Sequence, residues 1–326
     1  MKVLNKEEAL ASINELAFQN QPFLFISDFS CENNHVITID EIDTDELLFS
    51  INGFSNVPTD FRASSEIDIQ KRPIPFKEYE KIFDKVHHEL AIGNTYLLNL
   101  TGKTPIDLNG SLEDVYHCSA ARYKLWFRDE FVVFSPETFV QIQDGKISSF
   151  PMKGTIDAKI ENAEQIILSS QKEMAEHTTI VDLIRNDMSI HARNVKVEEF
   201  RYVDHVKTNS KDLLQVSSKI TGDLEKGYEN RLGDILFSLL PAGSISGAPK
   251  PKTLEIISRY ENYNRGYYTG IMGYFDGKNF DSGVMIRFIQ KEANTYFYKS
   301  GGGIHFLSES QAEYQEMIDK VYVPIH

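Results

Sequence analysis

The chain has 326 residues, of which 41% are hydrophobic, 11% aromatic and 25% charged, a composition typical of a folded globular protein and not of a disordered one. Lys and Arg (34) are outnumbered by Asp and Glu (48), and the formal charge of -14 excludes a general attraction for nucleic acid or anionic lipid. Two cysteines, Cys31 and Cys118, are too few for a disulfide framework or a cysteine zinc site. Since residues 1–20 lack the apolar core of a signal peptide and no window approaches the ~20 apolar residues of a membrane span, we expect a cytoplasmic protein.

The first third of the chain predicts helices followed by short strands. Apolar residues at helical spacing indicate a helix over 7–18, and short apolar runs indicate strands at 23–26 and 46–51. A second helix is expected over 77–92, and it leads into a strand over 95–100.

The middle of the chain predicts a strand meander. Strands are expected over 131–134, 138–143 and 146–150, with a hairpin turn at Asp144-Gly145 between the last two. The next segment, 151–155, reads as a loop that joins the last strand to a helix.

The last half predicts long helices and a second meander. Helical spacing extends over 158–186 and begins again near Lys252, and a closing helix is expected over 308–321 with Ser308 as its N-cap. Strand-like runs lie between these helices, at 268–275, 279–290 and 294–299. No linker or repeat divides the sequence, so we expect one α+β unit built on antiparallel sheet.

Two glycine-rich segments are candidates for ligand contact. The segment 241–250 (PAGSISGAPK) precedes a helix, where free backbone amides can bind an anion, although it matches no nucleotide-binding motif and an ordinary loop is the alternative. Three glycines at 301–303 end a strand, which is typical of a place where a ligand or another backbone comes close.

Two acidic pairs have the same helical spacing. Glu173 with Glu176, and Glu313 with Glu316, each lie three positions apart and therefore on one helix face. Taken singly, each pair reads as solvated helix surface. Brought together, four carboxylates would repel one another unless a divalent cation such as Mg²⁺ lay between them.

Lys153 is a candidate nucleophile near an acidic residue, Glu137. An exposed loop lysine is the alternative, since an attacking amine needs a pKa lowered by burial or by a nearby cation. His177 adjoins Glu176, but no other histidine stands at metal-ligand spacing, so helix packing or support of a ligand is the expected role. The chain contains no G-x-S-x-G or G-x-C-x-G elbow.

Eight segments occur in the order and approximate spacing found in the chorismate-utilising enzymes, which the chain therefore resembles over residues 75–322. The segments are SPE (135–137), PMKGT (151–155), AEHTTIVDLIRND (175–187), PAGSISGAPK (241–250), YYTGIMGYF (267–275), GVMIR (283–287), GGGI (301–304) and AEYQEMIDK (312–320). The resemblance is strongest to the component I group of aminodeoxychorismate synthases. It implies a fold of two stacked, mainly antiparallel sheets with helices outside, forming a single domain over 1–326 with a shortened amino-terminal segment (1–75) and a catalytic core (76–322).

The resemblance also implies a role for each candidate residue. Mg²⁺ would be ligated by Glu176 and Glu316, with Glu173 and Glu313 supporting through water. Catalysis would use Lys153 as nucleophile and Glu137 as general acid. Substrate-binding positions would be Thr155, Gln215 (where the family usually has histidine), Ser246, Gly247, Tyr268, Arg287, Gly302, Gly303 and Lys320.

The activity implied is the Mg²⁺-dependent amination of chorismate by ammonia to 4-amino-4-deoxychorismate, a precursor of 4-aminobenzoate and folate. Lys153 is the discriminating residue, because the corresponding loop of anthranilate synthases resembles PIAGT, with alanine. Leu97 occupies the position of the water-activating lysine of isochorismate synthases. Component I of anthranilate synthase remains an alternative, as does a catalytically silent binding partner. Nitrogen is expected from a separate glutamine amidotransferase subunit or from free ammonia, with no nucleic-acid or membrane partner.

Overall fold

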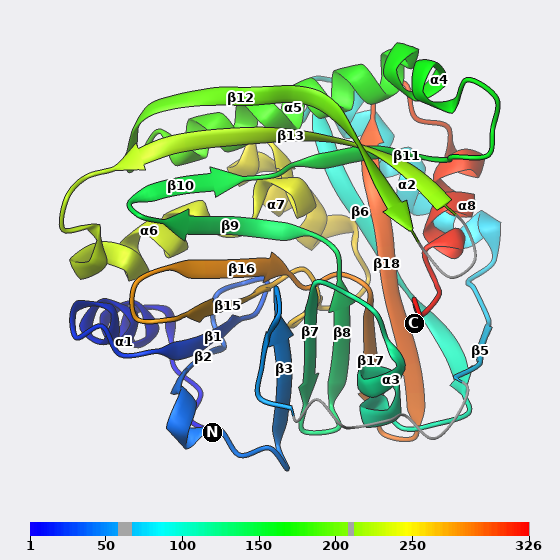
Figure 1. The fold of residues 1–326 in the computed structure, drawn as a ribbon. Coiled ribbons are helices and arrows are strands. Elements are labelled where there is room, and N and C mark those ends of the chain that lie inside the picture. The colour runs from blue at the N-terminus through cyan, green and yellow to red at the C-terminus, as the bar shows by residue number, and fades with distance from the viewer. Residues whose placement is uncertain (58–66, 208–211, 326) are drawn as a thin grey trace.

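Within the residues that the structure describes, two antiparallel β-sheets of nine strands each form the centre of the protein, with helices around them (Figure 1). The computed structural model describes residues 1–57, 67–207 and 212–325. The expected α+β class, with two mainly antiparallel sheets, is confirmed.

The first sheet combines strands from the beginning, middle and end of the chain. They are β1 (Phe23–Ser27), β2 (Asn34–Thr38), β9 (Thr138–Gln143), β10 (Lys146–Ser149), β11 (Met152–Asp157), β12 (Ala192–Lys207), β13 (Asp212–Leu224), β15 (Ile271–Phe275) and β16 (Phe280–Val284). Their order is β11-β13-β10-β9-β16-β15-β1-β2, and β12 pairs with β13.

The second sheet is built in the same way. Its strands are β3 (Leu47–Ile51), β4 (Phe54–Ser55), β5 (Ile69–Lys71), β6 (Leu97–Leu108), β7 (Tyr123–Phe127), β8 (Phe131–Ser135), β14 (Gly247–Ala248), β17 (Phe288–Glu292) and β18 (Thr295–His305). Their order is β14-β6-β18-β17-β8-β7-β3-β4, and β5 pairs with β6. The longest of these pairings, between β6 and β18, places the three glycines at 301–303 opposite residues 99–101.

The helices of the described residues are α1 (Lys6–Phe18), α2 (Phe76–Ala91), α3 (Leu112–Cys118), α4 (Ala163–Ser169), α5 (Gln171–Met188), α6 (Leu232–Leu239), α7 (Lys250–Tyr260) and α8 (Ser310–Asp319). A local signal fixes the start of α1: the side chain of Asn5 accepts a hydrogen bond from the amide of Glu8, and the Glu8 carboxylate accepts one from the amide of Asn5. In the part of the chain that the structure describes, no helix is long and apolar enough to cross a membrane.

Apolar side chains of both sheets pack against each other. Leu24 and Met272 of the first sheet belong to one buried cluster with Phe49, Tyr123 and Phe288 of the second sheet. The amino-terminal segment contributes to both sheets, because β1 pairs with β15 and β3 pairs with β7. Residues 58–66 of that segment lie outside the described residues.

Four local predictions need correction. The expected loop at 151–155 lies largely in β11, because residues 152–157 pair with β13 through an irregular register that local sequence does not reveal. The expected helix over 158–186 is two helices, and Ser170 caps the second by accepting a hydrogen bond from Glu173. Glu309, and not Ser308, is the N-cap of α8. The run 279–290 is interrupted between β16 and β17, where Arg287 has a φ of 54°. The hairpin turn at Asp144-Gly145 is confirmed by the pairing of β9 with β10.

Candidate active site

The ends of β11, β18, α5 and α8 meet around two glycines of β18. A Cβ added to Gly303 would lie 2.8 Å from Lys153 Nζ and 3.3 Å from Glu176 Oε2. A Cβ added to Gly302 would lie 3.1 Å from Glu316 Oε1 and 3.6 Å from Lys320 Nζ. Side chains at these two positions would displace the charged groups, so the glycines predicted to contact a ligand lie against both the candidate nucleophile and the candidate metal ligands.

Ion pairs link these elements. Lys153 Nζ on β11 lies 3.6 Å from Glu176 Oε2 on α5, and Lys320 Nζ lies 2.6 Å from Glu316 Oε1. Lys320 also donates a 2.8 Å hydrogen bond to the carbonyl oxygen of Gly301. The structure thus brings together residues from four of the segments that the sequence singled out.

Lys172, which the sequence analysis did not select, joins the two acidic pairs. Its Nζ lies 2.6 Å from Glu313 Oε1 and 4.0 Å from Glu176 Oε1. Helical spacing predicts the contact with Glu176, four positions away, but the contact with Glu313 depends on how α5 and α8 approach each other.

The carboxylates fit Mg²⁺ in their chemistry, because Mg²⁺ prefers oxygen ligands. Within the described residues, however, no group of three or more His, Cys, Asp or Glu residues is arranged closely enough to hold a metal ion, and lysine ammonium groups lie against three of the carboxylates. Burial raises the pKa of Glu176 to about 7, an effect that Lys153 opposes and Glu173 reinforces. Added positive charge would stabilise this buried carboxylate in its ionised form.

Glu137, directly after β8, is a candidate proton donor. One of its carboxyl oxygens accepts a hydrogen bond of 2.5 Å from Ser244 Oγ. Burial raises the pKa of Glu137, while the bond from Ser244 and the positive charges of Lys153 and Lys320 act in the opposite direction. A cavity of about 20 Å³, room for about one water molecule, adjoins Glu137 and Ser244. Ser244 was not selected from the sequence, although it lies inside the glycine-rich segment.

Tyr268 and Arg287 lie close enough to Glu137 for their charges to influence one another. Tyr268 is buried, and this burial raises the pKa of its hydroxyl, on which the charges of Arg287 and Glu137 also act. The Arg287 guanidinium lies 5.0 Å from the centre of the Tyr322 ring, a cation–π contact.

The remaining substrate-binding candidates are placed by backbone contacts. Gly247 has a φ of 137°, and a Cβ there would lie 2.0 Å from the carbonyl oxygen of Leu97, so only glycine fits. Ser246 is fully buried and donates its hydroxyl hydrogen bond to the carbonyl oxygen of Ala242. Thr155 of β11 is exposed and pairs in register with the half-buried Gln215 of β13.

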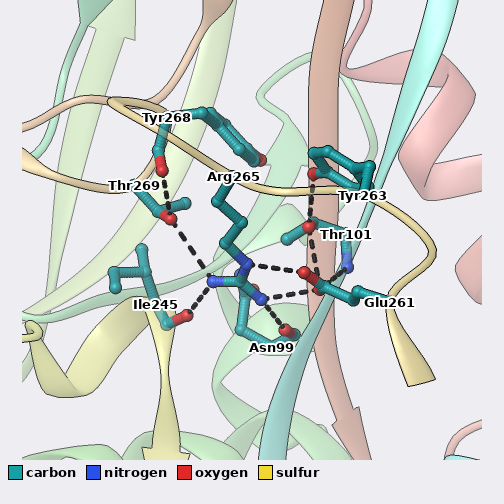
Figure 2. A network of polar contacts seen from close by, with 8 residues as sticks. All are labelled: Asn99, Thr101, Ile245, Glu261, Tyr263, Arg265, Tyr268 and Thr269. Atoms are coloured by element: carbon teal, nitrogen blue, oxygen red, sulfur yellow. Dashed lines mark hydrogen bonds and ion pairs between the residues drawn. The ribbon is translucent and has the colours of Figure 1, made fainter. Parts of the chain in front are cut away.

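A buried ion pair behind the site ties its walls together (Figure 2). Arg265 and Glu261 side chains are each 2% exposed and lie 2.7 Å apart. The Arg265 guanidinium also donates to the carbonyl oxygens of Asn99 and Ile245 and to Thr269 Oγ1. These acceptors belong to β6, to the glycine-rich segment just before Ser246, and to the segment just after Tyr268. Glu261 and Arg265 stand four positions apart, which does not by itself mark a site, and the link to Asn99, 166 positions away, depends on the tertiary structure.

His177 is buried, and its Nε2 lies 2.6 Å from Ser218 Oγ on β13. Burial, together with the positive charge of Arg201, lowers the pKa of His177 to about 4. The neutral ring packs between α5 and β13, in agreement with the packing role expected from the sequence.

The fold and these residues define a chain of the chorismate-utilising type, and the comparisons with known proteins identify the family: the chain belongs to the chorismate binding enzymes, whose family model matches residues 12–326. It is 47% identical over 312 residues to an uncharacterized PabA-like protein of Haemophilus influenzae, covering 96% of this chain and 95% of that protein.

Characterised relatives match at lower identity. Aminodeoxychorismate synthase component 1 of Klebsiella aerogenes is 32% identical, covering 77% of this chain and 57% of that protein. Anthranilate synthase component 1 of Aquifex aeolicus is 31% identical, covering 75% and 51%. The chain thus spans about half the length of these two synthases.

Solved structures share the fold. Anthranilate synthase component I of Streptococcus pneumoniae superposes with a TM-score of 0.66 at 26% identity, covering 81% of this chain and 61% of that one. The isochorismate synthase MenF of Escherichia coli superposes with a TM-score of 0.73 at 16% identity, covering 98% and 82%.

Proposed function

We propose that the chain aminates chorismate with ammonia to give 4-amino-4-deoxychorismate and water, on the route to 4-aminobenzoate and folate. The observation that carries this proposal is the place of Lys153, whose amine lies 3.6 Å from Glu176 and against Gly303. Overall similarity does not separate this activity from anthranilate synthesis, because relatives of both kinds match at 31 and 32% identity. The lysine, in place of the alanine typical of anthranilate synthases, favours amination.

Two displacements would replace the C4 hydroxyl with nitrogen and retain configuration. The Lys153 amine attacks C2 of chorismate while the C4 hydroxyl takes a proton from Glu137 and leaves as water. Ammonia then attacks C4, the bond between Lys153 and C2 breaks, and Glu137 regains a proton from the incoming nitrogen. A carboxyl whose pKa is raised by burial holds its proton more readily and is therefore suited to this exchange.

Charged groups around the glycines would hold the substrate. Arg287 would pair with the enolpyruvyl carboxylate beside Tyr268, and Lys320 would neutralise the ring carboxylate near the amides of Gly302 and Gly303. Glu176 and Glu316 would hold Mg²⁺, with Glu173 and Glu313 contributing through water. The ion would supply positive charge that orients the ring carboxylate.

Hydration of chorismate is disfavoured by Leu97. This side chain is buried, and its Cδ1 lies 3.3 Å from the Cβ position of Gly303, so an apolar group occupies the place where a water-activating base would be needed.

The nitrogen source is proposed to be a separate amidotransferase subunit or free ammonia. Glutamine hydrolysis on a cysteine needs a reactive thiolate. Both cysteines are buried, and burial raises the pKa of Cys118 and raises that of Cys31 to about 11. Two buried cysteines also agree with the proposed cytoplasmic location.

The test is identification of the product by mass spectrometry after incubation with chorismate, Mg²⁺ and ammonia. We expect 4-amino-4-deoxychorismate without pyruvate, and an enzyme–substrate adduct in the intact mass during turnover. Lys153→Met is expected to lower the rate about 1,000-fold or more, while Lys159→Met, which removes an exposed lysine, is the matched control.

Two outcomes would reject the proposal. Release of pyruvate with fluorescent anthranilate would assign the chain to anthranilate synthesis. Binding of chorismate without any turnover, unchanged by Lys153→Met, would favour the silent partner.

A further inference from the structure

Lys172 lies where the two acidic helices face each other. It belongs to the first turn of α5, and its ammonium lies 2.6 Å from Glu313 of α8 and 4.0 Å from Glu176. The side chains of Glu313 and Glu176 are 2% and 6% exposed, whereas that of Lys172 is 31% exposed. One partly exposed cation therefore lies against two buried carboxylates from different helices.

A second cation cannot occupy this place while Lys172 remains in it. The ammonium group donates to carboxylate oxygens of the kind that a divalent ion would ligate. Two positive groups at ~4 Å would also repel each other. A divalent ion can bind Glu176 and approach Glu313 only after the Lys172 ammonium moves away.

The Lys172 side chain can move away from this place, and the other two lysines of the site have different surroundings. Its four-carbon side chain is flexible and partly solvent-exposed, so it can swing outward from the start of α5. Lys320 is held by Glu316 and by a hydrogen bond to Gly301, and Lys153 is 16% exposed beside Gly303.

We propose that Lys172 is a built-in counter-ion that occupies the cation position between Glu176 and Glu313 when no metal is bound and is displaced when a divalent ion binds. The inference rests on the Mg²⁺ requirement in the proposed function but not on the identity of the product. Because Lys172 must be displaced, the protein binds the ion less tightly than it would without this lysine. The ion pair between Lys172 and Glu313 stabilises the metal-free protein.

The test is calorimetric titration of the metal-free, full-length protein with MnCl₂ and with MgCl₂, without chorismate. Lys172→Met keeps the length of the side chain and removes its charge, and is expected to bind the ion about fivefold more tightly or better. Lys159→Met removes the same charge from an exposed position and is expected to change the affinity less than about twofold. An unchanged or weaker affinity of Lys172→Met would overturn the proposal.

Thermal unfolding gives a second readout. With EDTA present, Lys172→Met is expected to unfold at a lower temperature than the wild type, because Glu313 loses its partner, and excess Mg²⁺ is expected to remove that difference. An unfolding temperature of Lys172→Met that is the same with EDTA and with excess Mg²⁺ would contradict the proposal. If Lys172→Met does not fold, Lys172→Gln, which retains hydrogen-bonding capacity, is measured in the same way.

The same titrations test the metal requirement and the role of Lys172 separately. If neither the wild type nor Lys172→Met binds Mn²⁺ or Mg²⁺ at millimolar concentrations, both the metal requirement and the role of Lys172 are rejected. If the wild type binds and the variant binds no more tightly, only the role of Lys172 is rejected.

Discussion

Lys153 Nζ and Glu176 Oε2 lie 3.6 Å apart, so one ion pair joins the candidate nucleophile of β11 to a candidate metal ligand of α5. An amine held against a carboxylate is not free to attack carbon. A divalent ion on Glu176 would take over this carboxylate and release the amine. The pair would thereby make the reactivity of Lys153 depend on whether an ion is bound at Glu176.

The first prediction concerns this coupling. Reaction of Lys153 with an amine-specific reagent, followed by peptide mass spectrometry, is expected to become several-fold faster when Mg²⁺ is added. In Glu176→Gln, which removes the carboxylate, the effect of Mg²⁺ is expected to disappear. A rate in the wild type that is independent of Mg²⁺ would argue against the coupling.

Glu137 and Ser244 are expected to differ in their contributions. Glu137→Gln removes the transferable proton and is expected to lower the turnover number by a factor of about 100 to 1,000, with little change in chorismate binding. Ser244→Ala removes only the hydrogen bond to Glu137 and is expected to lower it by about tenfold. Steady-state kinetics with both variants checks this order, and equal losses would show that Ser244 does more than orient the carboxyl.

Gly303→Ala tests the close approach at β18. The added methyl carbon would lie 2.8 Å from Lys153 Nζ, the far end of a flexible side chain, so we expect activity to fall more than about tenfold while thermal stability changes little. Gly102→Ala, on the neighbouring strand β6, meets only Met317 Sδ at 3.1 Å and is the control, expected to stay near wild-type activity. Full activity of Gly303→Ala would show that Gly303 is not part of the active site.

Arg265→Lys tests whether the buried ion pair positions the site walls. Lysine retains the charge but cannot reproduce the fork that reaches Glu261, Asn99, Ile245 and Thr269, so unfolding in urea is expected to show a loss of about 2 kcal/mol. The KM for chorismate is expected to rise more than the turnover number falls. Lower stability with an unchanged KM would show that the pair of Arg265 and Glu261 stabilises the fold but does not position the substrate site.

His177 gives a prediction for pH. Its pKa in the folded protein, about 4, lies below the ordinary value of 6.5, so the unfolded chain binds more protons between these values and stability falls as the pH drops through that window. Between pH 7.5 and pH 5, the wild type is expected to lose about 2 kcal/mol more stability than His177→Asn. Urea unfolding at both pH values measures this difference, and parallel losses in the two proteins would show that other groups are responsible.

Much of the fold was predictable because its signals are local. The helix expected over 77–92 is α2, and the strand expected over 138–143 is β9, since both patterns depend on neighbouring residues alone. Strand β11 was taken for a loop because its partner, β13, lies some 60 residues further on, and pairing with that strand decides its conformation.

By itself, the sequence determined which chemical groups are present and their local spacing: an amine in the PMKGT segment, acidic pairs one helical turn apart, and glycines where a strand ends. Only the tertiary structure decided which groups meet. The hydrogen bond from Ser244 to Glu137 and the ion pair between Lys172 and Glu313 each join residues more than 100 positions apart. Such contacts depend on how two sheets and two helices pack against one another, and helical or strand periodicity carries no information about that packing.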